Sequence, residues 1–283
     1  MADAAGDAAP GDLPFPTFVV IGAMRSGSTS LYKYLQDHPD VFMPRKEIHF
    51  FDRRWDHGVT WYRHRFEGYA GELAIGEATP TYLTDPVALD RMAATIPDAR
   101  LVAVLRNPVD RAYSHYWMEH ARDRDPRTFE QAIDDEQLTA TSPSDYLARG
   151  RYAEQLEEVA GRFPREHVHV LLLDDLRDRP EPTYAAVCTF LGVDAGFVPP
   201  RIGEKVNRFV SFRSMRVRGV RRKLPTVLRI GRIVGRLNAT DDPYVPMAAE
   251  TRAALDAHFA EANDALAAWL GRDLPPTWSR RPP

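Results

Sequence analysis

Residues 19–31, which read VVIGAMRSGSTSL, combine groups that bind a phosphate-like anion. Gly22 and Gly27 allow backbone N–H groups to turn toward one point, and a helix predicted from Ser28 adds the positive end of its dipole. Arg25 adds a bidentate cationic donor. Hydroxyl side chains flank the second glycine at Ser26, Ser28, Thr29 and Ser30. The sequence therefore predicts an anion-binding loop, and a solvated Gly/Ser turn is the alternative that the loop alone leaves open.

This loop differs from that of metal-dependent nucleoside triphosphatases. Those proteins need a lysine after the second glycine and an aspartate at the end of a neighbouring strand to hold Mg²⁺. Here Ser28 takes the place of the lysine, and the apolar run LVAVL ends in Arg106. A cation at that strand end would repel Mg²⁺ and attract a second anion. The pattern favours a ligand with two separate anionic groups and predicts no metal site, with a P-loop kinase-like phosphotransferase as the alternative enzyme.

Arg106 and Ser114 form a second candidate anion site. Arg106 closes the strand predicted over residues 99–106, and Ser114 lies about two turns into the helix predicted over residues 107–121. Both side chains can face the space above the N-terminus of this helix, where a phosphate is also favoured. A strand-end arginine in a surface salt bridge is the alternative.

Residues 44–52, PRKEIHFFD, carry a candidate general base. Glu47 lies between Lys46 and His49, ahead of the apolar pair Phe50 and Phe51. A glutamate beside cations is most often a surface ion pair. Next to an anion-binding loop, however, such a carboxylate can accept a proton from an attacking group.

Buried strands alternate with amphipathic helices along the chain. The predicted strands are residues 17–22, 73–78, 99–106 and 167–176. The predicted helices are residues 28–38, 85–96, 107–121, 151–163, 181–193 and 248–270. This alternation predicts an α/β fold of the P-loop-like, three-layer α/β/α type with a central, mostly parallel sheet. Ligands of such sheets bind beyond the carboxyl ends of the strands, where all the candidate residues fall.

Composition is that of a globular α/β protein. The chain has 283 residues, of which 44% are hydrophobic and 27% charged, and a formal net charge of −3, which gives no sign of a nucleic-acid role. Its one cysteine, Cys188, permits no internal disulfide. We expect residues 1–16 to be a disordered tail without signal-peptide features, residues 17–283 to form one domain, and the cytoplasm to be the location.

The segment of residues 201–240 departs from this average. It holds twelve Arg or Lys residues against one acid, Glu204, so its charge is +11 and that of the remainder is −14 (−3 − 11). Apolar residues are interleaved with these cations. Three hypotheses stay open: a solvated amphipathic lid, a patch for a membrane surface or lipid acceptor, and a site for an anionic polymer.

Taken together, these motifs resemble those of the PAPS-dependent sulfotransferases, in particular the heparan sulfate sulfotransferases and their bacterial relatives. The resemblance rests on GAMRSGSTSL, HPDVFMPRKEIHFFD, VLRNPVDRAYSHY, GEATPTYL, GRYAEQL, FLGV and LGRDLPPTW, and it spans residues 17–278. It implies that residues 22–30 bind the 5′-phosphosulfate of PAPS and that Arg106 and Ser114 bind its 3′-phosphate. It further implies that Glu47 is the catalytic base with His49 nearby, and that Arg213 contacts the nucleotide.

The motifs depart from the family pattern at two positions. Arg25 stands where the family often has a lysine that donates to the bridging oxygen, and Ala78 stands where heparan-type enzymes tend to have a lysine. An arginine donates no proton at neutral pH, so Arg25 should act electrostatically.

The resemblance implies transfer of a sulfuryl group from PAPS to a hydroxyl or amine, leaving 3′,5′-ADP and using no metal. The acceptor would be a small molecule, a glycolipid or a carbohydrate, with residues 201–240 as a candidate contact to a membrane surface. A non-catalytic protein that binds nucleotide or a lipid surface is the alternative class. Acceptor identity and oligomeric state are not predicted.

Overall fold

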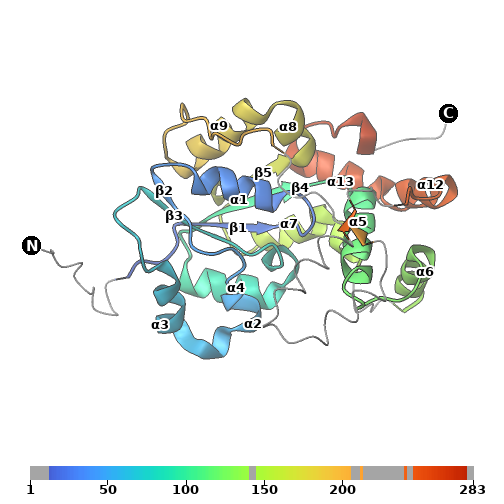
Figure 1. Cartoon of the computed structure of the whole chain (residues 1–283), viewed down its shortest axis with the longest axis horizontal. Helices are drawn as coiled ribbons and strands as arrows, with labels where there is room; N and C mark the ends of the chain where they lie inside the picture. The colour runs from blue at the N-terminus through green and yellow to red at the C-terminus, as the bar shows by residue number, and fades with distance from the viewer. Residues whose placement is uncertain (1–12, 140–144, 205–210, 213–238, 241–244, 279–283) are drawn as a thin grey trace, which may run out of the picture.

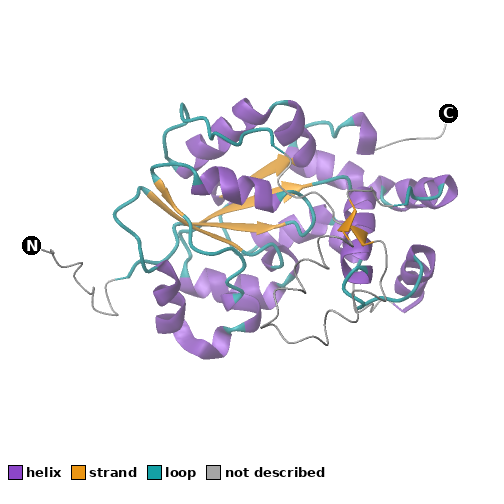
Figure 2. Ribbon diagram, viewed as in Figure 1, coloured by secondary structure: helices purple, strands orange, loops and turns teal. Residues whose placement is uncertain are grey.

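A five-stranded sheet forms the centre of the computed structural model (Figures 1 and 2). The structure describes residues 13–139, 145–204, 211–212, 239–240 and 245–278. The strands are β1 (Phe18–Gly22), β2 (Val41–Phe42), β3 (Ala74–Ala78), β4 (Arg100–Leu105) and β5 (Val168–Leu172). Their order is β2-β3-β1-β4-β5, and every pairing in this sheet is parallel. The predicted α/β class is therefore confirmed.

Strand β1 is the central strand of the sheet, and all five of its residues are buried. Phe18 is level with Gly76 of β3 on one side and with Arg100 of β4 on the other. Such a strand needs a continuous apolar run rather than an alternating one. The loop of residues 22–30 leaves this central strand at its carboxyl end, which is the position predicted for a ligand.

Helices cover both faces of the sheet (Figure 1). One buried cluster is contributed by α1 (Ser28–Gln36), α8 (Leu173–Asp178) and α9 (Pro180–Leu191). The opposite cluster is contributed by α2 (Phe50–Arg53), α3 (Gly58–Arg63), α4 (Pro86–Thr95), α7 (Tyr152–Ala160) and α13 (Ala260–Leu270). A third cluster joins α5 (Pro108–His120), α6 (Phe129–Thr139) and α12 (Ala249–His258). The three-layer arrangement follows from these two covered faces.

Two predicted elements were wrong in extent. The predicted strand 167–176 ends at Leu172, the last residue paired with β4, and α8 begins at Leu173. Asp174 and Asp175 lie in the first turn of α8, where acidic side chains are favoured by the helix dipole. The predicted helix 248–270 is interrupted at Phe259, so that α12 packs in the third cluster while α13 packs against the sheet.

Short elements were not predicted. Strand β2 and helices α2, α3 and α6 carry too few residues, or too weak a periodicity, to stand out in the sequence. The residues before β1 also make contacts with the domain. Phe15 packs against the buried cluster, and the Arg63 guanidinium lies 5.2 Å from the centroid of its ring. Residues 1–12 and most of residues 201–240 lie outside the described residues.

Close packing between β1 and β3 makes Gly76 a sensitive position. A Cβ atom at Gly76 would lie 2.1 Å from Cζ of Phe18 and 2.5 Å from Sδ of Met43. We therefore expect Gly76→Ala to lower the free energy of unfolding by about 1–3 kcal/mol, the usual cost of overpacking. Urea unfolding followed by circular dichroism measures this. Gly161→Ala is the control, because its Cβ would meet nothing closer than 3.5 Å, and equal effects of the two substitutions would contradict the prediction.

Candidate active site

The glycine-bounded loop between β1 and α1 has the geometry of an anion site. Gly27 is the N-cap of α1 and adopts φ = 98°, a left-handed conformation that favours glycine. A Cβ atom there would also lie 2.6 Å from Cδ1 of Leu173. Because glycine has no side chain that could cap the helix, the N–H groups at its start are available to a ligand.

The predicted loop residues differ in accessibility. Ser26 is fully buried and Ser28 is buried, whereas Arg25, Thr29 and Ser30 are partly exposed. Arg25 adopts φ = 71°, so the backbone is left-handed at a non-glycine residue beside the predicted site. The loop therefore presents its cation and two of its hydroxyls at the surface of the sheet edge.

Arg25 joins the loop to the second candidate anion site. Its Nε donates to Oγ of Ser114 at 3.1 Å, and its Nη1 approaches Sδ of Met118 at 3.8 Å. Nη1 of Arg106 in turn donates to the backbone oxygen of Arg25 at 3.3 Å. Residues that are far apart in sequence, after β1, after β4 and on α5, therefore meet at one point. Arg213, the remaining predicted nucleotide contact, lies outside the described residues.

Lys46 is a residue of the candidate site to which the sequence analysis assigned no role. Its Nζ donates to Oγ1 of Thr29 at 2.7 Å and to Oγ of Ser28 at 3.3 Å. The same Nζ lies 3.5 Å from Oε1 of Glu47. Burial lowers the pKa of the Lys46 ammonium, an effect that Glu47 opposes and that Arg25 reinforces. The only signal in the sequence was that Lys46 directly precedes the predicted base.

Glu47 stands at the edge of the loop with an accessible carboxylate. Its side chain is 53% exposed, so a second reactant can reach it. Its backbone adopts φ = 64°, which costs a non-glycine residue about 1–2 kcal/mol. The backbone N–H of Glu47 donates to the oxygen of Ala78 at 2.9 Å, which ties it to the carboxyl end of β3. The predicted base and the predicted anion loop are thus brought together through Lys46.

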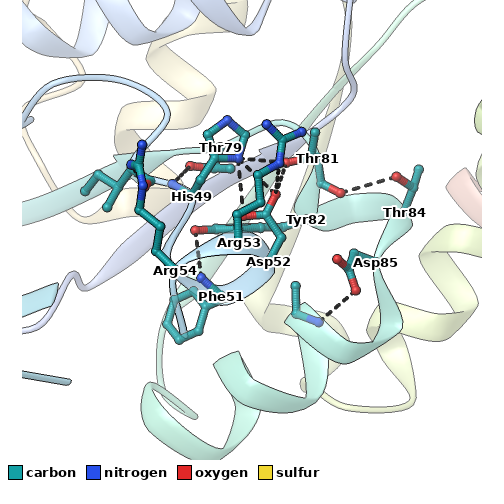
Figure 3. A network of polar contacts seen from close by, with 12 residues as sticks. His49, Phe51, Asp52, Arg53, Arg54, Thr79, Thr81, Tyr82, Thr84 and Asp85 are labelled. Carbon is teal, nitrogen blue, oxygen red and sulfur yellow. Dashed lines mark hydrogen bonds and ion pairs between the residues drawn. The ribbon is translucent and has the colours of Figure 1, made fainter. Parts of the chain in front are cut away.

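His49, Asp52 and Thr81 form a group of polar contacts (Figure 3). Nδ1 of His49 lies 2.9 Å from Oδ2 of Asp52, and the hydroxyl of Thr81 donates to the same oxygen at 2.7 Å. Burial alone would raise the pKa of Asp52, but the contacts from His49 and Thr81 lower it below its ordinary value. Asp52 therefore orients the imidazole, a role that the sequence analysis did not assign.

A buried carboxyl group lies in β3, two residues before Thr79. Glu77 of β3 is 1% exposed and accepts hydrogen bonds from Thr79 at 2.7 Å and from Tyr82 at 2.8 Å. The hydroxyl of Tyr62 donates to its other oxygen. Burial raises the pKa of Glu77, although the hydrogen bonds partly offset this. The network holds β3 against α3 and the turn that leads to Thr81.

Beneath Ser114, α5 carries further buried basic side chains. Arg111 is fully buried and donates to the backbone oxygen of Tyr146. Burial lowers the pKa of Arg111 to about 10. Burial, together with Arg111 and Arg149, also holds the pKa of His115 far below its ordinary value, so this imidazole is neutral. The surroundings of the second site are therefore cationic. Among the described residues no three His, Cys, Asp or Glu side chains converge as a metal site would require.

A glycine-bounded loop that leads from the carboxyl end of the central parallel strand into a helix defines the class of P-loop-like α/β proteins. Within this class, the chain belongs to the sulfotransferase domain family, whose model matches residues 15–230. The predicted family is thereby confirmed.

Individual relatives agree with this assignment. Over 108 residues, or 37% of this chain and 23% of the relative, the chain is 42% identical to the membrane-associated sulfotransferase kil1 of Dictyostelium discoideum. It is 31% identical to human heparan sulfate glucosamine 3-O-sulfotransferase 3B1 over 185 residues, which are 65% of this chain and 47% of that protein. The match therefore spans less than half the length of these two relatives.

A solved structure matches nearly the whole chain. The sulfotransferase from Alicyclobacillus acidocaldarius superposes with a TM-score of 0.73 at 29% sequence identity, covering 94% of this chain and 100% of that one. This agreement confirms the α/β architecture. No helix within the described residues is both long enough and apolar enough to cross a membrane.

The raised pKa of Glu77 predicts a pH-dependent contribution to stability. A carboxyl whose pKa is higher in the folded state stabilises the fold below its unfolded pKa, about 4.3, and loses that contribution as the pH rises through the folded pKa. The stability advantage of the parent protein over Glu77→Gln should therefore shrink as the pH rises. Urea unfolding at a series of pH values measures it. The exposed Glu157→Gln on α7 is the control, and a constant difference for Glu77→Gln would contradict the prediction.

Proposed function

We propose that the chain transfers the sulfuryl group of PAPS to a hydroxyl or amine of an acceptor. Membership of the sulfotransferase domain family supports the reaction type. The observation that carries the proposal is that two positively charged sites for anions lie next to each other. They are the loop before α1 and the pair of Arg106 and Ser114, and Arg25 connects them. PAPS carries two such anionic groups, its 5′-phosphosulfate and its 3′-phosphate.

In this proposal the 5′-phosphosulfate lies on residues 22–30 and the 3′-phosphate lies against Arg106 and Ser114. The backbone N–H groups at the start of α1 supply donors to the first group. The buried Ser114 and the cationic Arg111 of α5 favour the second. Because Arg25 already contacts Ser114, we assign its guanidinium to the space between the two groups rather than to the bridging oxygen alone.

Glu47 is the proposed general base. Its carboxylate takes the proton from the acceptor hydroxyl or amine, whose oxygen or nitrogen forms a bond to sulfur as the bond from sulfur to the bridging oxygen breaks. The electron pair of the broken bond stays on the phosphate of 3′,5′-ADP. Positioning and charge stabilisation supply the acceleration, as in phosphoryl transfer. His49, oriented by Asp52, is two residues from Glu47 in the same segment, and we assign it a contact to the acceptor.

The acceptor belongs to a small molecule, a glycolipid or a carbohydrate in this proposal. Residues 201–240, which lie largely outside the described residues, remain the candidate lid or membrane-surface contact. One relative is described as membrane-associated, which is a reason to test whether residues 201–240 contact a membrane surface. Such a contact would suit a peripheral location on the cytoplasmic side of a membrane. Binding to anionic liposomes, with and without this segment, is that test.

Glu47→Gln should lower the rate of sulfuryl transfer about 10²–10⁴-fold, because the amide cannot accept the acceptor proton. Affinity for 3′,5′-ADP should stay near that of the parent protein, since the proposed nucleotide contacts are untouched. Transfer of ³⁵S from labelled PAPS into cell extract gives the rate, and calorimetry gives the affinity. Glu157→Gln serves as the control, and near-normal turnover of Glu47→Gln would remove Glu47 from this role.

Arg106→Ala should weaken the binding of 3′,5′-ADP about 10-fold to 100-fold, the loss expected for a hydrogen bond to a charged group. Calorimetric titration measures it, with the exposed Arg124→Ala as the control. A parallel titration with ATP and Mg²⁺ tests the phosphotransferase alternative, which requires the parent protein to prefer that ligand. Unchanged affinity of Arg106→Ala for 3′,5′-ADP would refute the assignment of Arg106.

A further inference from the structure

The Lys46 ammonium lies at a place where a cation is unfavourable in the ligand-free protein. Its ammonium contacts Ser28 and Thr29, the first two residues of α1. The N-terminus of a helix carries partial positive charge and favours anions. Arg25 adds a second positive charge nearby, which contributes to lowering the pKa of Lys46. This arrangement is electrostatically unfavourable until an anion lies between these groups.

Among the described residues, no carboxylate compensates fully for this arrangement. The Lys46 side chain is only 15% exposed, so its charge has lost much of its hydration. Its acidic partner, Glu47, is 3.5 Å away and half exposed, and a pair of that kind contributes little. A structural lysine would gain more by turning to solvent, as long basic side chains usually do.

The backbone around Lys46 holds it in this place. Two residues earlier, the oxygen of Pro44 accepts a hydrogen bond from the Tyr32 hydroxyl of α1 at 2.8 Å. One residue later, the N–H of Glu47 is bonded to Ala78 at the end of β3. The segment is thus fixed on both sides of Lys46, and the ammonium is directed onto the loop.

Arg25 does not take this position. Its guanidinium contacts Ser114 and Met118 on α5, away from the hydroxyls at the start of α1. The two cations therefore have different contacts: Arg25 contacts α5, whereas Lys46 contacts the start of α1 and Glu47.

We propose that Lys46 binds the phosphosulfate group of the donor together with residues 22–30, and that it stabilises the charge that grows on the phosphate as the sulfuryl group leaves. This inference rests on the function proposed above. The ammonium donates a hydrogen bond to the bridging oxygen, the bond from that oxygen to sulfur breaks, and the electron pair remains on the phosphate of 3′,5′-ADP. The acceptor proton goes to Glu47, so Lys46 keeps its own proton throughout.

The decisive variant is Lys46→Met, which keeps the length of the side chain and removes its charge. Lys33→Met is the matched control, because Lys33 lies in the last turn of α1, where a cation is favoured. Two ligands separate the subsites: 3′,5′-ADP carries the 5′-phosphate that Lys46 should contact, and adenosine 3′-phosphate does not.

We expect Lys46→Met to weaken the binding of 3′,5′-ADP about 10-fold to 100-fold and to leave the binding of adenosine 3′-phosphate unchanged. Transfer of ³⁵S from PAPS into cell extract should fall about 10²–10³-fold, the scale for loss of one charge-stabilising donor. The melting temperature of the ligand-free protein should stay the same or rise, because an unfavourable cation has been removed. Lys33→Met should change neither affinity nor rate.

Other outcomes would overturn the inference. A variant Lys46→Met that fails to fold, or whose ligand-free melting temperature falls, would mark Lys46 as a structural residue. Equal losses of affinity for both ligands would indicate a general disturbance rather than a contact to the 5′ group, and an unchanged affinity for 3′,5′-ADP would show that no contact exists. The proposed function fails separately, if the parent protein itself neither binds 3′,5′-ADP nor transfers label from PAPS.

Discussion

Positive charge gathered at one edge of a parallel sheet is the constraint on which the rest of this structure depends. The start of α1, Arg25, Lys46 and Arg106 meet within a few side-chain lengths. Like charges at this spacing repel one another unless an anion lies between them. The fold therefore gathers cations where a bound anion would offset their repulsion, and the chain that forms it belongs to the sulfotransferase domain family.

Holding these groups requires rigid support from β3. Glu47 and His49 both adopt left-handed backbone conformations, which are uncommon for residues other than glycine. The oxygen of Ala78 and the hydroxyl of Thr79 bind their two N–H groups. Next to them in β3, Glu77 and its two tyrosine partners form a buried hydrogen-bond network. The strain in the segment that carries the proposed base is thus balanced by contacts to one strand end.

Much of the fold and part of the site could be predicted from the sequence, because the signals are local. The apolar run before Gly22 predicted the central strand, and the glycines around Arg25 predicted the turn that follows it. Elements whose limits depend on neighbours were harder to predict. Strand β5 ends at Leu172 because β4 offers no further residue for pairing, and Phe259 interrupts a helix whose two halves pack on different clusters.

The sequence by itself determined the alternation of strands and helices and the glycine-bounded loop that follows the central strand. Only the tertiary structure decided where the side chains of the loop region point. Arg25 turns to Ser114, a residue 89 positions away, and Lys46 turns to Thr29, 17 positions away. Spacing along the chain does not reveal such contacts, because they depend on how β3 and α5 pack against the central strand and fix the segments that carry these cations.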